Sequence, residues 1–171
     1  MFQHIKIGKI VATFGVTGEV ILVHNLGKKS TFKNVEALFI EQTKDSLIPF
    51  FISSVKAKTD EECYVLFEDK KSKESAKMLV GKAVWLLQDD FKNLANKKSP
   101  IALLGFMVIS NNEKIGIVDE VIEQPHQILL TINYKGKEAY LPMHQDSLIN
   151  IDYKKNEIEL NLPEGLLEIY L

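Results

Sequence analysis

The chain has 171 residues, 46% of them hydrophobic, so it is long enough for one ordinary domain or for two small ones with separate cores. Its longest apolar runs fall far short of the ~20 residues that span a bilayer, and residues 1–4 lack a basic and apolar leader, which predicts a cytoplasmic protein with no membrane partner. The single cysteine, Cys63, excludes an intrachain disulfide and a cysteine-based zinc site.

The basic residues are all lysines, 21 in number, and arginine is absent. Because arginine supplies the planar fork that grips phosphate or guanine, its absence argues against sequence-specific recognition of nucleic acid. Up to Gln88 the chain has 13 lysines against 10 acidic residues, a net charge of +3, and after Gln88 it has 8 against 13, a net charge of −5. The acidic half suits a basic protein partner better than bare RNA.

A glycine-punctuated loop between two β-branched runs opens the chain. The runs contain Ile5 to Val11 and Val20 to Val23, which predicts two strands joined by a turn in which Gly15 and Gly18 take positive φ. Loops on a rigid scaffold often carry binding side chains, so we expect partner-binding residues here: Thr13, Phe14, Gly15, Val16, Thr17 and Gly18. The alternative for Phe14 and Val16 is that they cap the end of a barrel.

Short strand-like runs recur through the first half at a spacing typical of a small barrel or sandwich. They cover Val20 to Val23, Ala37 to Glu41, Pro49 to Val55, Cys63 to Glu68 and Ala83 to Leu87. One helix interrupts them, because Ser72 can cap a helix that runs to Gly81 and places Ala76, Leu79 and Val80 on one face. Trp85 is interpreted as a plug of the barrel core rather than a platform for ligand stacking.

The polar stretch 89–99 predicts a linker, so we expect one domain at residues 1–88 and another at residues 100–171. Strands resume beyond it, over Gly105 to Ser110, Lys114 to Glu123, Ile128 to Tyr134, Glu138 to Leu141, Ile149 to Asp152 and Glu157 to Leu160. The pair Lys135-Gly136 suits a tight primed turn. The sequence therefore predicts an all-β chain of two different small β-barrels in tandem, with a short helix.

Several segments resemble the RimM family of bacterial ribosome maturation factors, in the family's order. They are Gly8-Lys9-Ile10 followed by Gly15-Val16-Thr17-Gly18-Glu19-Val20, Leu47 to Phe51, Ala76 to Gly81, Leu103-Leu104-Gly105, Gly116 with Val118, Glu123 with Pro125 and Leu129, Leu141-Pro142, Ile151-Asp152 and Leu162 to Leu167. The resemblance implies a six-stranded barrel like those of translation factors and flavin reductases in the first half. It implies a PRC-barrel in the second half.

The same resemblance implies a factor that assists late assembly of the small-subunit head and efficient processing of small-subunit (16S) rRNA, without a catalytic step or a cofactor. The implied partners are the small-subunit head protein numbered nineteen, held by the C-terminal barrel, and the maturing 30S subunit with its rRNA. RimM proteins often carry an aromatic pair just before Leu103, where this chain has Lys98 and Ser99. Either Phe91 or Phe106 substitutes for the pair, or the contact is weaker or rearranged.

The titratable residues form no catalytic pattern in the sequence. The four histidines lack metal-ligand spacing, no nucleophile elbow surrounds a serine, and a strand instead of a helix follows the glycine loop. We therefore expect no metal site and no small-molecule substrate, and we expect binding at two further loops: Pro125, His126 and Gln127, and Pro142, Met143 and His144. Each proline has a plain alternative role in shaping its turn. The alternative function is a flavin- or nucleotide-binding reductase domain fused to an interaction barrel.

Overall fold

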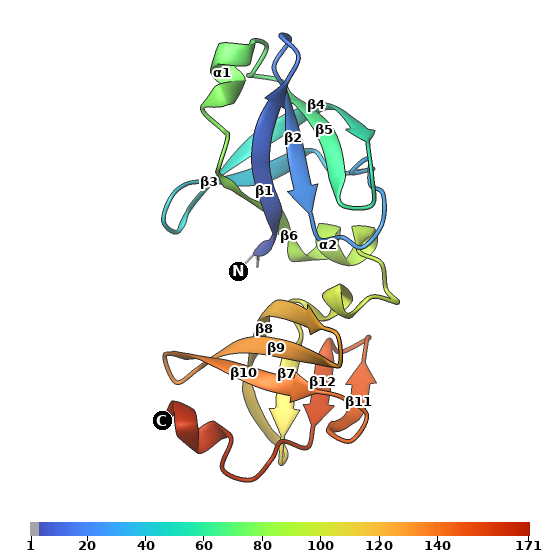
Figure 1. Cartoon of the computed structure of the whole chain (residues 1–171), viewed down its shortest axis with the longest axis vertical. Helices are drawn as coiled ribbons and strands as arrows, with labels where there is room; N and C mark the ends of the chain where they lie inside the picture. The colour runs from blue at the N-terminus through green and yellow to red at the C-terminus, as the bar shows by residue number, and fades with distance from the viewer. Residues whose placement is uncertain (1–3) are drawn as a thin grey trace. The chain divides into compact units, whose positions relative to one another are not determined.

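The computed structural model describes residues 4–171, so residues 1–3, which belong to the predicted first domain and to the start that was expected to lack a leader, lie outside the described residues. The chain divides into two compact units, the first ending at Ala102 and the second spanning Leu103–Leu171 (Figure 1). Both units consist mainly of β-strands, which confirms the predicted all-β class. Every helix within residues 4–171 is too short or too polar to cross a membrane.

Six strands of the first unit close into a barrel in the order β1-β2-β5-β4-β3-β6. Their bounds are β1 His4–Phe14, β2 Glu19–His24, β3 Ala37–Thr43, β4 Ser46–Ala57, β5 Glu62–Phe67 and β6 Ala83–Leu87. Alternate side chains point inward, as where Val20 pairs with Val65 and Leu22 with Cys63, all four of them buried. The alternation of apolar residues read from the sequence thus becomes the barrel core.

Trp85 lies on the outer side of this barrel, contrary to the prediction that it plugs the core. Its neighbours in β6, Val84 and Leu86, are buried, and side chains alternate across a strand, so the Trp85 ring faces the other way. Its strand partners are Lys6 and Phe39, and its ring is half-buried. Because β6 is apolar at every position, its sequence lacks the polar alternation that would have indicated which side faces the core.

A short helix, α1 (Lys73–Lys77), precedes β6. It begins at Ser72 as predicted, where the Ser72 side chain accepts a hydrogen bond from the Ser75 N–H at 3.2 Å. The helix ends four residues before the predicted end at Gly81. Ala76 and Leu79 are buried on its predicted apolar face, whereas Val80 is exposed.

The stretch 89–99, predicted to be a linker, is folded as part of the first unit. Helix α2 (Gln88–Leu94) occupies most of it, and Phe91 and Ala95 are buried. The Asn96 N–H then donates to the Leu26 carbonyl oxygen at 2.8 Å. The boundary between the units falls at Ala102, within the short 3-10 helix η1 (Pro100–Leu103).

The second unit is a six-stranded sheet in the order β10-β9-β8-β7-β12-β11. The strands are β7 Met107–Ser110, β8 Glu113–Gln124, β9 Gln127–Tyr134, β10 Lys137–Met143, β11 Leu148–Asp152 and β12 Glu157–Leu160, and a 3-10 helix, η2 (Leu167–Tyr170), ends the chain. Strand β8 connects two parts of the sheet, because its first half pairs with β7 and its second half with β9. In Figure 1 the strands β8, β9 and β10 run across the view while β7, β12 and β11 run along it.

The core of the second unit lies between these two parts of the sheet. Val108 and Ile158 from one part, and Leu130, Ile132 and Leu141 from the other, are fully buried. The hairpin between β9 and β10 has the predicted turn: Lys135 and Gly136 both have positive φ, 50° and 87°. This turn fixes the register that places the side chains of β9 and β10 opposite one another.

Candidate functional site

The loop between β1 and β2 presents three predicted binding side chains to solvent: Phe14, Val16 and Thr17. Phe14 is 48% exposed and Val16 is 77% exposed, whereas Thr13 is half-buried. The Phe14 ring contacts the ring of Tyr64 in β5, with centroids 4.4 Å apart. Because the neighbours of Tyr64 in β5 point into the core, this pair lies on the outer wall of the barrel rather than over its end.

The two glycines of this loop both have positive φ, as predicted, but for different structural reasons. Gly15, with φ 68°, lies in open space, since a Cβ there would meet no atom within 4 Å. Gly18, with φ 105°, is buried, and a Cβ there would lie 1.9 Å from the Lys70 carbonyl oxygen. Gly18 therefore allows the loop to pack against the backbone of the segment that leads to α1.

Lys98 and Ser99 lie in the first unit, at the opposite end of β2 from the glycine loop. The N–H of Lys98 donates to Asn96 Oδ1 at 3.1 Å, and Lys98 is exposed. Ser99 is half-buried close to Gly27, which follows the end of β2, whereas Gly18 precedes its start. The structure thus does not bring these two groups of predicted residues together.

Phe106 belongs to the core of the second unit, with only 3% of its surface exposed. Phe91 is buried as well, so neither ring can take the place of an exposed aromatic pair. Beside Phe106 lies Tyr153, whose ring meets it edge-on with centroids 5.8 Å apart and which is more than half exposed. Of the two rings in this contact, only that of Tyr153 is accessible to a partner.

Two loops of the second unit come together around an open groove with a volume of about 700 Å³. Predicted residues line it, namely Pro125, His126, Gln127, Met143 and His144, and so do residues that the sequence did not single out, namely Glu123, Gln124, Ile128, Gln145 and Asp146. Pairing of β9 with β10 places Met143 opposite Ile128, which is why loops so far apart in sequence meet. The groove combines apolar surface with two carboxylates and two imidazoles.

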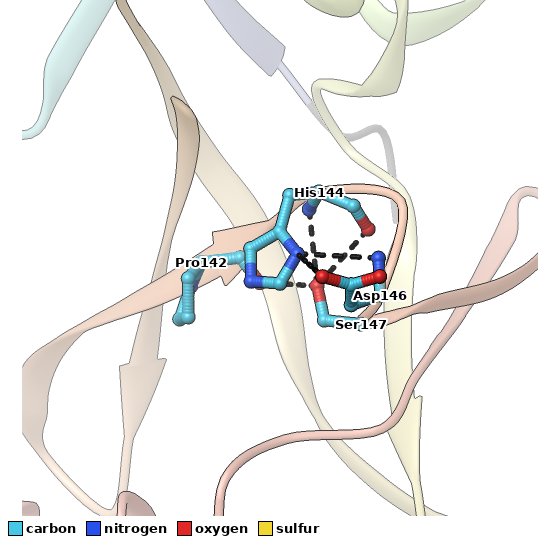
Figure 2. Close-up of polar contacts among 4 residues, drawn as sticks. All are labelled: Pro142, His144, Asp146 and Ser147. Carbon is cyan, nitrogen blue, oxygen red and sulfur yellow. Dashed lines mark hydrogen bonds and ion pairs between the residues drawn. The ribbon is translucent and has the colours of Figure 1, made fainter. Parts of the chain in front are cut away.

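Figure 2 shows the loop after β10, in which a serine, a histidine and an aspartate lie close together without forming a catalytic triad. Ser147 Oγ donates to the Pro142 carbonyl oxygen at 3.1 Å and accepts from the His144 N–H at 3.0 Å. His144 Nδ1 accepts from the Asp146 N–H at 3.2 Å. A triad would need the hydroxyl to donate to the imidazole, whereas here main-chain groups hold it. These contacts fix the loop that forms one wall of the groove.

The buried titratable groups of the first unit belong to its core. Burial raises the pKa of Cys63 to about 12, so its thiol stays protonated at neutral pH. Burial also lowers the pKa of His24, whose Nδ1 accepts a hydrogen bond from the Leu26 N–H. In the part of the chain that the structure describes, no group of three His, Cys, Asp or Glu side chains could hold a metal ion.

Two family models match this chain. Residues 5–91 match the family model described as the RimM N-terminal domain, and residues 100–166 match the RimM PRC barrel domain. The chain is similar to proteins named Ribosome maturation factor RimM, with 30% identity over 167 residues in Christiangramia forsetii and 30% over 168 residues in Parabacteroides distasonis. Each of these alignments covers 96% of this chain and 95% of the relative.

Among solved structures, the chain is similar to a putative 16S ribosomal RNA processing protein RimM from Pseudomonas aeruginosa, at 15% identity and a TM-score of 0.43, covering 94% of this chain and 98% of that one. The family assignment depends on the two domain matches and on the relatives that are 30% identical over nearly their whole length. The chain belongs to the RimM family.

Proposed function

We propose that this chain is a ribosome maturation factor that assists late assembly of the small-subunit head and efficient processing of small-subunit rRNA. Its relatives, which align with 96% of this chain, carry the name ribosome maturation factor. The protein acts in the cytoplasm by binding alone, without a covalent step. Binding to one arrangement of an assembly intermediate shifts the population of intermediates toward that arrangement.

The opposite charges of the two units carry the assignment of partners. The first unit has 16 lysines against 12 acidic residues, a net charge of +4, and the second has 5 against 11, a net charge of −6. An acidic surface attracts a basic protein, which supports the partner that the family resemblance implies for the second unit, the small-subunit head protein numbered nineteen. The lysine-rich first unit, with its exposed Phe14 loop, faces the rRNA of the maturing subunit.

The groove of the second unit is the contact site for the head protein. Its apolar lining, made of half-buried Ile128 and the 8% of Met143 that is exposed, can take the stem of a basic residue, while Glu123 and Asp146 meet the charged end. A double variant, Glu123→Gln with Asp146→Asn, should therefore weaken binding to immature small subunits. The matched control is Glu113→Gln with Glu159→Gln, which removes the same charge from residues of the second unit outside the groove.

The decisive experiment is a sucrose-gradient profile of ribosomal particles from cells depleted of this protein and complemented with each variant. Depletion should enrich immature small subunits that contain unprocessed rRNA, and the intact protein should co-sediment with those particles. The groove variant should co-sediment less than the control. Unchanged profiles after depletion would refute the proposed function, and a purified protein with the absorption bands of bound flavin would favour a reductase.

A further inference from the structure

A second surface of the acidic unit lies on the outer side of strands β8, β9 and β10. Cross-strand pairing puts Glu120, Thr131 and Tyr140 in one row, because Thr131 pairs with both of the others. The intervening residues Leu130 and Leu141 are buried in the core, so this row points to the opposite side of the sheet, where Thr131 is buried between its exposed neighbours Glu120 and Tyr140. We name this surface the Tyr140 face.

The next row of the Tyr140 face, two residues along each strand, is apolar. It consists of Ile122, Leu129 and Pro142, which pair across the same strands. All three are half-buried, and Tyr140 beside them is 39% exposed. The face therefore offers an aromatic ring and aliphatic surface to a partner.

Two carboxylates, Glu138 and Glu120, act on Tyr140, and a third, Asp119, lies near Glu138. The Tyr140 hydroxyl donates to Glu138 Oε2 at 2.8 Å, and that hydrogen bond raises the pKa of the phenol, to which the charge of Glu120 also contributes. Burial and the charge of Glu138 raise the pKa of Asp119. Within residues 4–171 none of these three carboxylates forms an ion pair, and the nearby Lys137 donates to the Leu171 carbonyl oxygen instead.

We infer that the Tyr140 face binds an arginine-bearing segment of a basic protein. A guanidinium group stacks on an aromatic ring and donates hydrogen bonds in its own plane to carboxylate oxygens, which matches Tyr140 flanked by Glu120 and Glu138. The aliphatic stem of the arginine then covers Ile122 and Leu129. The inference depends on the proposed function, because it identifies the chemistry of the basic partner, and the negative charge of the face disfavours RNA.

Docking on this face uses side chains rather than strand addition. In the edge strand β10 the Tyr140 N–H already donates to the Tyr170 hydroxyl at 3.3 Å, and Pro142 has no N–H. The Pro142 carbonyl oxygen already accepts a hydrogen bond from Ser147 Oγ at 3.1 Å. An added strand would thus find few free hydrogen-bonding groups along this edge.

The test measures binding of the full chain to a fluorescein-labelled peptide of alternating arginine and serine, by fluorescence anisotropy. Glu120→Gln with Glu138→Gln should raise Kd about fivefold, whereas the control Glu113→Gln with Glu159→Gln, on the other part of the sheet, should change it less than twofold. Tyr140→Leu should weaken binding, whereas Tyr140→Phe, which keeps the ring, should not. Thermal melting of each variant checks that it is folded.

Equal weakening by the Glu120 and Glu138 substitutions and by the control substitutions would overturn the inference, because the effect would then be one of net charge. Stronger binding to an oligouridylate than to the peptide would overturn it in favour of RNA. The proposed function is tested separately by co-sedimentation. A protein that co-sediments with immature subunits but does not bind the peptide would refute the Tyr140 face alone, and the reverse result would refute the proposed function alone.

Discussion

Replacement of Gly18 by alanine should destabilise the first unit far more than the same replacement of Gly15. At both positions an alanine would occupy positive φ, which costs about 1 to 2 kcal/mol. At Gly18 the new Cβ would also lie 1.9 Å from the Lys70 carbonyl oxygen, so the backbone must move. Overpacking of this kind adds about 1 to 3 kcal/mol, which gives about 2 to 5 kcal/mol for Gly18→Ala and about 1 to 2 kcal/mol for Gly15→Ala.

Urea unfolding followed by the fluorescence of Trp85 measures this difference, because the only tryptophan of the chain lies in β6 of the first unit. The midpoint should fall much further for Gly18→Ala than for Gly15→Ala, with little change in slope. Equal losses of unfolding free energy for the two variants would refute the assigned role of the Lys70 contact. A loss confined to Gly15→Ala would refute the assignment of open space around that residue.

Three further predictions concern buried residues of the first unit. The pKa of His24 is lowered in the folded state, so the unfolded state takes up a proton more readily, and stability should fall as the pH drops below the ordinary histidine value of ~6.5. His24→Asn should reduce the difference between the urea midpoints at pH 7.5 and pH 5.5, and an unchanged difference would contradict the prediction. Because the pKa of Cys63 is about 12, iodoacetamide at pH 8 should alkylate this thiol only when the protein is unfolded in urea, as mass spectrometry would show. Rapid alkylation of Cys63 without urea would contradict this prediction. Phe91→Ala should lower the free energy of unfolding by about 3 to 5 kcal/mol, whereas Asn93→Ala, at an exposed position of the same helix, should lower it by less than about 1 kcal/mol. An unchanged free energy for Phe91→Ala would show that α2 acts as a linker and does not belong to the core of the first unit.

The strands could be predicted because their polarity alternates or their turns are distinctive. The pair Lys135-Gly136 indicated a primed turn, and its two positive φ angles confirm it. Helix α2 was missed because the stretch is mostly polar, although Phe91, Leu94 and Ala95 have the i, i+3, i+4 spacing of a helix with one buried stripe. The orientation of Trp85 could not be read from β6, because every residue of that strand is apolar.

The candidate site was predictable only in part, since it depends on pairing between strands that are distant in sequence. The loops at Pro125 and Met143 could be chosen separately as exposed turns, but their meeting around one groove follows from the register of β9 with β10. Phe106 was a candidate to replace the missing aromatic pair, and only its burial shows that Tyr153 is the exposed ring of the Phe106–Tyr153 contact. Local pattern therefore indicates which loops exist, whereas register decides which side chains share a surface.

The division of charge between the units suits a factor that must bind a protein–RNA junction and later leave it. On the proposed function, the second unit, at −6, occupies basic side chains of the head protein that would otherwise meet rRNA phosphates too early. Exposed ion pairs contribute only about 0.2 to 1 kcal/mol each and are screened beyond ~8 Å at physiological salt, so they hold the partner without trapping it. On the same proposal, the rRNA of the folding head presents a denser array of negative charge than the Tyr140 face, and it displaces the factor by competing for the same basic residues.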